Sequence, residues 1–68
     1  SLRIEVALET GSTVEIRLGS EDMPVDPAPV EGVNEWTVRI PEPSQPLIVS
    51  VCAADRRCAL YWANTYSG

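Results

Sequence analysis

The sequence predicts an all-β domain, most simply a small antiparallel β-sandwich of about five strands. Apolar residues alternate with polar ones in several short runs, which is the period of a half-buried β-strand. Clusters of glycine, proline and serine separate these runs, as turns separate strands. The 68 residues are enough for one domain, residues 1–68, with a thin core that needs additional stabilisation such as a disulfide.

The first part of the chain predicts a β-hairpin over residues 2–19, because two alternating runs flank the turn Thr10-Gly11-Ser12. Pairing the runs across this turn places apolar side chains on one face and Glu5 opposite Arg17 on the other. The apolar pairs in this register are Leu8 with Val14, Val6 with Ile16, and Ile4 with Leu18.

Residues 20–34 predict a long, acidic, proline-rich loop, since three prolines and a glycine interrupt any strand or helix period. The net charge of −5 is concentrated between residues 21 and 42, where carboxylates outnumber a lone arginine. We expect the loop to be either a binding element or a crossover whose apolar residues cover the core. These apolar residues are Met23, Val25, Val30 and Val33. The acids show no calcium-ligand spacing, so no metal site is expected.

Trp36, Val38 and Ile40 alternate with polar residues and predict a strand over residues 35–41, which ends at the proline run 41–46. Residues 47–63 then predict a second hairpin, closed by a disulfide between Cys52 and Cys58. One face of this hairpin is the core face, with Leu47, Val49 and Val51 opposite Ala63, Tyr61 and Ala59. The other face pairs Ile48 with Trp62 and Ser50 with Leu60.

The second hairpin is apolar on both faces, unlike the first. Its second face is therefore either covered by the proline-rich loop or available to a partner. Candidate binding residues are Ile48, Leu60 and Trp62 on this face, Arg56 and Arg57 at the tip of the loop, and Tyr66.

The composition argues against several classes of function. The chain has no histidine and no lysine, which are the commonest general base and the usual Schiff-base amine, so we expect no enzyme, no catalytic residues and no cofactor. Five residues between the cysteines do not match the spacing of redox-active pairs. An acidic chain without a basic patch is a poor ligand for nucleic acid and for anionic membranes.

The five predicted strands, two hairpins and one crossover approximate a reduced immunoglobulin-like sandwich, and a partly open small β-barrel is the alternative. The Cys…Trp…Cys spacing of immunoglobulin domains is absent, so no family is assigned. The disulfide predicts an extracellular or periplasmic location.

The leading hypothesis is a non-catalytic interaction module that binds a protein partner and is a monomer in isolation. It could be a natural accessory domain or a designed scaffold, because the regular first hairpin suits a design whereas the proline content does not. One alternative is a small secreted inhibitor or toxin-like protein that acts through Asp55-Arg56-Arg57. Another is a carbohydrate-binding module that uses exposed aromatic side chains.

Overall fold

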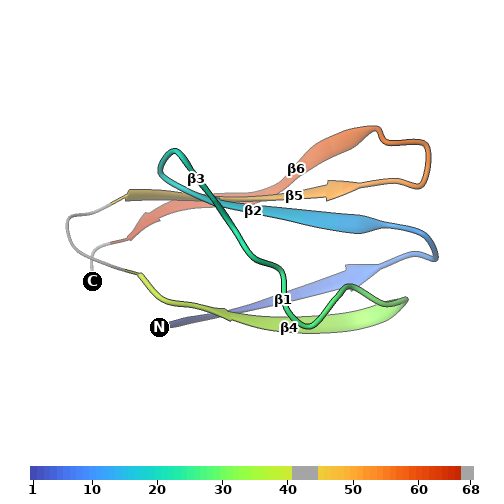
Figure 1. Ribbon diagram of the computed structural model, residues 1–68, viewed down its shortest axis with the longest axis horizontal. Coiled ribbons are helices and arrows are strands. Elements are labelled where there is room, and N and C mark those ends of the chain that lie inside the picture. Colours follow the sequence, from blue (N-terminus) through green and yellow to red (C-terminus); the bar gives the residue numbers. More distant parts are fainter. Residues whose placement is uncertain (41–44, 67–68) are drawn as a thin grey trace.

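The computed structural model describes residues 1–40 and 45–66, the side chain of Tyr66 excepted. These residues form two antiparallel sheets, and none of them lies in a helix long and apolar enough to cross a membrane. One sheet has the order β1-β4 and the other β3-β2-β5-β6 (Figure 1). The strands are β1 (Leu2–Leu8), β2 (Thr13–Leu18), β3 (Glu21–Met23), β4 (Gly32–Val38), β5 (Gln45–Cys52) and β6 (Cys58–Tyr66).

The two sheets pack face to face and confirm the all-β class and the sandwich, with six strands in the described residues rather than five. The apolar positions of each alternating run point between the sheets, as the period of two requires. Four side chains at the centre are almost completely buried: Val6, Ile16, Leu47 and Val49. Around them lie Ile4, Leu8, Val14, Leu18, Trp36 and Val38.

The predicted pairing of the first two runs is wrong, because β1 pairs with β4 and β2 pairs with β5. Residues 9–12 carry the chain from one sheet to the other, in a turn where Gly11 has a φ of 80°. The apolar faces of β1 and β2 therefore meet across the core instead of lying side by side. Glu5 consequently faces Glu35 on β4 and not Arg17.

The predicted loop over residues 20–34 is shorter in the structure, because both of its ends are strands. The chain turns at Gly19, with a φ of 61°, and β3 pairs with β2 so that Arg17 lies opposite Asp22. The following strand begins at Gly32 and ends at Val38 instead of spanning residues 35–41, of which residue 41 lies outside the described part.

The remaining segment, residues 24–31, crosses between the sheets and closes one side of the sandwich (Figure 1). Met23 and Val25 pack against the core as expected, whereas Val30 and Val33 are exposed. The segment is held by the indole of Trp36, whose Nε1 donates a hydrogen bond of 2.7 Å to the Pro27 carbonyl.

Asn34 is the buried polar residue that shapes the end of this segment, and the sequence analysis did not identify it. Its Nδ2 donates to the carbonyl oxygens of Val30 at 2.8 Å and Gly32 at 3.0 Å. Its Oδ1 accepts a hydrogen bond of 2.9 Å from the Val30 amide. One side chain thus satisfies backbone groups that would otherwise be unpaired at the start of β4.

The pairing of β5 with β6 follows the prediction only for its first half. Cys52 lies opposite Cys58, and Ser50 opposite Leu60, but an irregularity between Val49 and Ser50 then shifts the register. Tyr61 is the extra residue of this β-bulge. The predicted pairs of Val49 with Tyr61, Ile48 with Trp62 and Leu47 with Ala63 are wrong. The observed partners of Val49, Ile48 and Leu47 are Trp62, Ala63 and Asn64.

Candidate functional site

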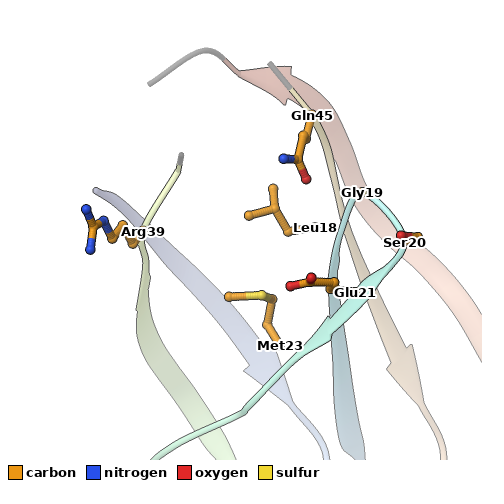
Figure 2. Close-up of a pocket in the computed structure, with 7 residues that line it drawn as sticks. All are labelled: Leu18, Gly19, Ser20, Glu21, Met23, Arg39 and Gln45. Atoms are coloured by element: carbon orange, nitrogen blue, oxygen red, sulfur yellow. The ribbon is translucent and has the colours of Figure 1, made fainter. Parts of the chain in front are cut away.

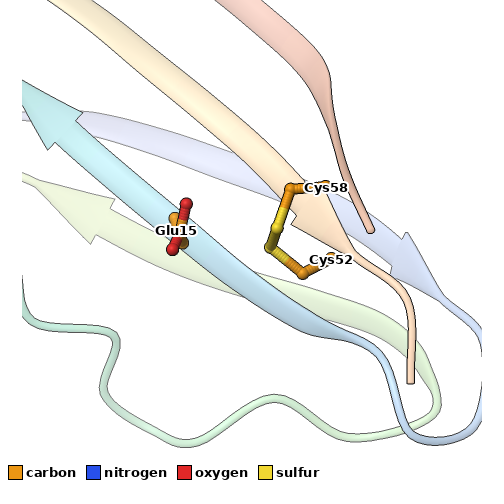
Figure 3. Close-up of side chains that lie close together, drawn as sticks. All are labelled: Glu15, Cys52 and Cys58. Carbon is orange, nitrogen blue, oxygen red and sulfur yellow. A yellow bond between two sulfur atoms is a disulfide. The ribbon is translucent and has the colours of Figure 1, made fainter. Parts of the chain in front are cut away.

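The disulfide lies on the outer face of the larger sheet, at the end of the β5–β6 hairpin. Cys52 and Cys58 are bonded with an S–S distance of 2.07 Å, as the sequence predicts. Figure 3 shows Glu15 of β2 beside them, and its carboxylate oxygen and the two sulfur atoms lie within 4.8 Å of one another. Because each sulfur is bonded to the other, neither is a thiolate ligand, and this cluster is a structural cross-link.

The tip of the hairpin is a tight turn with an internal ion pair. Arg56 has a φ of 70°, in the left-handed region, and its amide donates to the Ala53 carbonyl at 2.9 Å. The Arg57 Nε lies 2.7 Å from the Asp55 Oδ2. The Arg57 backbone amide and then its side chain hold the pKa of Asp55 below its ordinary value. Arg56 and Arg57 are therefore presented on a curved turn and not on an extended segment.

The predicted binding face of Ile48, Leu60 and Trp62 is not a single face in the structure. Ile48 and Leu60 lie on the outer face of the sheet, half-buried and 66% exposed respectively. Trp62 packs against the core, because the bulge turns the following residues of β6 to the opposite face. The backbone of Tyr66 pairs with Gln45, and its side chain lies outside the described structure.

The bulge creates a different candidate site, on the side of the sandwich opposite the proline-rich segment. A hollow of about 160 Å³ lies between β1 and β6, lined by Arg3, Ile4 and Glu5 of the first strand and by Tyr61 and Trp62 of the last. Consecutive residues of a regular strand point to opposite faces. The extra residue in β6 allows both aromatic side chains to line one hollow. We refer to these five residues as the aromatic hollow.

The aromatic hollow combines a buried floor with an accessible rim. Ile4 is 6% exposed and belongs to the core, and Trp62 is partly buried against that core. Tyr61 is 50% exposed, and the charged side chains of Arg3 and Glu5 are accessible to solvent. Sequence reasoning selected Trp62 but missed the other four residues, since only the bulge and the packing of β1 beneath β6 bring them together.

Strand β6 itself is the second component of the site, because it forms an edge of the larger sheet. Its nine residues, from Cys58 to Tyr66, include no charged side chain. The other sheet edges are protected in the usual way: β3 is three residues long with two acids, and β1 and β4 carry Arg3, Glu5 and Glu35. In the described part of β6, the feature that hinders pairing with another strand is the bulge.

A larger hollow of about 740 Å³ lies around Gly19, at the end of the larger sheet opposite the disulfide (Figure 2). Leu18 and Met23 form its apolar wall, while the guanidinium of Arg39 points away from it. A Cβ at Gly19 would come within 2.5 Å of the Gln45 Oε1, so glycine allows this close approach.

The comparisons with known proteins add no family to this geometry. No family model, no curated protein and no solved structure matches the chain. The candidate site is therefore defined by its own residues: the uncharged edge of β6 and the aromatic hollow beside it.

Proposed function

We propose that this chain is a non-catalytic protein-binding module, which accepts an extended segment of a partner protein as an additional strand along β6. The observation that carries the proposal is the nine-residue edge strand without a charged residue. An edge strand has unpaired backbone N–H and C=O groups, and proteins normally protect such edges with charges, prolines or short strands. An extended peptide that adds to the edge satisfies these groups, which is a common mode of recognition.

The bulge determines how long the added strand can be. It divides β6 into Cys58–Leu60 and Trp62–Tyr66, and the ladder of backbone groups is irregular between them. A partner strand therefore pairs with one stretch at a time. The stretch after the bulge is the longer one. It begins at Trp62, which lines the aromatic hollow, so we assign the partner strand to it.

The distribution of charge supports a partner strand that is not strongly basic. The acids Glu21 and Asp22 lie on β3, which is the opposite edge of the sheet from β6. Interactions between exposed charges are largely screened beyond about 8 Å at physiological ionic strength. The acids of β3 therefore exert little attraction on a strand bound at β6, so the partner strand needs no positive charge.

The size of the aromatic hollow favours a protein partner over a free small molecule or sugar. Sites for small ligands typically measure about 300–1,000 Å³, whereas this hollow measures about 160 Å³. A volume of this size suits one side chain presented by a larger partner. The disulfide is compatible with an oxidising environment, and an extracellular or periplasmic setting is part of this proposal.

A heptapeptide display library selected on the wild-type protein tests strand addition. Peptides that bind are resynthesised with N-methyl groups on alternate amides, in two complementary sets. Because alternate amides of a strand face the same neighbour, one set should abolish binding and the other should leave it nearly unchanged. Loss with both sets, retention with both sets, or a failure to enrich any peptide would contradict the proposal.

A matched pair of variants locates the binding edge. Ala63→Lys introduces a charge in the stretch of β6 after the bulge, and Val33→Lys introduces the same charge on β4; both residues are exposed. We expect Ala63→Lys to weaken peptide binding by about tenfold and Val33→Lys to leave it unchanged, measured by isothermal titration calorimetry. Equal effects of the two variants would place the peptide elsewhere.

A further inference from the structure

We propose that the aromatic hollow binds an aromatic side chain, tryptophan or tyrosine, that the partner's added strand directs inward between β6 and β1. This inference rests on the proposed function and specifies the chemistry of the partner. In an added strand every second side chain points to the core side of the sheet. The aromatic hollow lies on that side of β6 and opens toward the unoccupied edge of β1, which pairs only with β4 in the described residues.

The volume of the hollow matches a single ring. It measures about 160 Å³, and an apolar cavity of about 150 Å³ is known to accommodate benzene. Ile4 provides an apolar floor, with only 6% of its surface exposed. A methyl-sized side chain would leave most of this space to water.

The walls favour an aromatic ring over an aliphatic side chain of similar size. Tyr61 and Trp62 both line the hollow, so an inserted ring would meet aromatic surfaces from two successive residues. Aromatic pairs in offset or edge-to-face arrangements are more favourable than their buried area alone accounts for. A branched aliphatic side chain would bury similar area without this additional attraction.

The rim favours an aromatic side chain that also donates a hydrogen bond. The Nε of Arg3 lies 3.8 Å from the Oε1 of Glu35 and forms an ion pair with it. Glu5, the other charged residue of the hollow, takes part in none of the ion pairs of the described residues. Its carboxylate can accept a hydrogen bond from an indole N–H or a phenol O–H. Tryptophan and tyrosine supply such a donor, whereas phenylalanine does not.

Side-chain analogues test the hollow without a peptide. The disulfide-bonded protein, labelled with ¹⁵N, is titrated by NMR with 3-methylindole, p-cresol, toluene and methylcyclohexane. We expect 3-methylindole and p-cresol to shift the amide signals of Ile4, Glu5, Tyr61 and Trp62 and to bind about fivefold more tightly than methylcyclohexane. Binding of methylcyclohexane at equal or higher affinity, or shifts confined to other residues, would overturn the aromatic assignment.

Matched variants then test the residues of the hollow. Tyr61→Ala removes an aromatic wall and should weaken 3-methylindole binding about fivefold, whereas Leu60→Ala, at its more exposed neighbour, should leave binding unchanged. Glu5→Ala should reduce the preference for p-cresol over toluene, and Glu5→Gln should retain it because the amide oxygen still accepts a hydrogen bond. Equal effects of the Tyr61 and Leu60 variants would contradict the assignment.

The peptide selection separates failure of this inference from failure of the proposed function. Peptides with alternate-amide dependence and one enriched tryptophan or tyrosine position support both. Alternate-amide dependence without an enriched tryptophan or tyrosine position supports strand addition but contradicts the inference that an aromatic side chain fills the hollow. If the analogues bind in the hollow but no selected peptide shows alternate-amide dependence, the proposed function is contradicted. The inference that an added strand carries the aromatic side chain into the hollow is then contradicted as well.

Discussion

The two sides of the sandwich differ in how their apolar surface is covered. On one side, residues 24–31 pass between the sheets, held by Asn34 and by the indole of Trp36. On the other side, β1 and β6 border a hollow with aromatic walls, and β6 presents an uncharged edge. The chain thus uses its own loop to complete one side, and we propose that a partner strand completes the other.

The two sides should also differ in their contribution to stability. Polar contacts with the backbone hold the covered side together, so its key residues stabilise the fold. The exposed residues of the other side can be changed with little effect on folding. The following predictions test this difference, from the largest expected effect to the smallest.

Asn34→Ala should lower the free energy of unfolding by about 2–3 kcal/mol, because it leaves backbone groups of Val30 and Gly32 without their partner. The matched change on the other side, Leu60→Ala, should cost about 0.5 kcal/mol or less, since Leu60 is 66% exposed. Urea denaturation monitored by tryptophan fluorescence measures both. Similar losses in the two variants would remove the distinction between the sides.

Replacing both cysteines with alanine should lower the free energy of unfolding by about 2 kcal/mol, because the disulfide no longer restricts the unfolded chain. Amide hydrogen exchange should become faster chiefly in β5 and β6, near the lost cross-link, and less so in β1 and β4. Uniform acceleration in all strands would indicate that the disulfide stabilises the two sheets equally.

Arg56→Gly should raise the free energy of unfolding by about 0.5–1 kcal/mol, because glycine adopts the left-handed conformation of this position without steric cost. Arg57→Gly is the control, since the φ of Arg57 is not positive and the change removes the ion pair with Asp55. Thermal unfolding followed by circular dichroism measures both. A loss of stability in Arg56→Gly would show that the arginine side chain has a structural role in the turn.

The smallest expected effect concerns the pH dependence of Asp55. Its pKa in the folded protein lies below the ordinary value of 3.8, so the hydrogen bonds of its carboxylate stabilise the turn above that pH. This contribution is lost as the pH falls through the lower, folded-state pKa. In a ¹³C NMR titration, Arg57→Ala should raise the midpoint only partly, because the backbone amide of residue 57 still donates. Full return to 3.8 would assign the shift to the arginine side chain alone.

Much of the core could be predicted from the sequence. The alternating runs place Val6, Ile16 and Leu47 on inward faces, and all three are buried. The cysteine pairing also follows from the spacing across a hairpin. These features depend on local geometry, namely the period of two in a strand and the short distance between neighbours across a turn.

The strand neighbours could not be obtained in the same way. The alternation of β1 is equally compatible with β2 and with β4 as a partner, since either arrangement buries Ile4, Val6 and Leu8. The choice depends on whether the turn after β1 stays within one sheet or crosses to the other. That choice is made by the packing of all the strands around one core.

The candidate site depends on a non-local feature as well. The single extra residue in β6 turns Trp62 toward the core and brings Tyr61 to the same hollow, which a regular register would not allow. Residue alternation thus decided which side chains are buried and where the disulfide forms, because both follow from short-range geometry. Only the packing of the two sheets decided which strands are neighbours, that the uncharged β6 lies at an edge and where the aromatic hollow lies, because these depend on contacts between residues far apart in the chain.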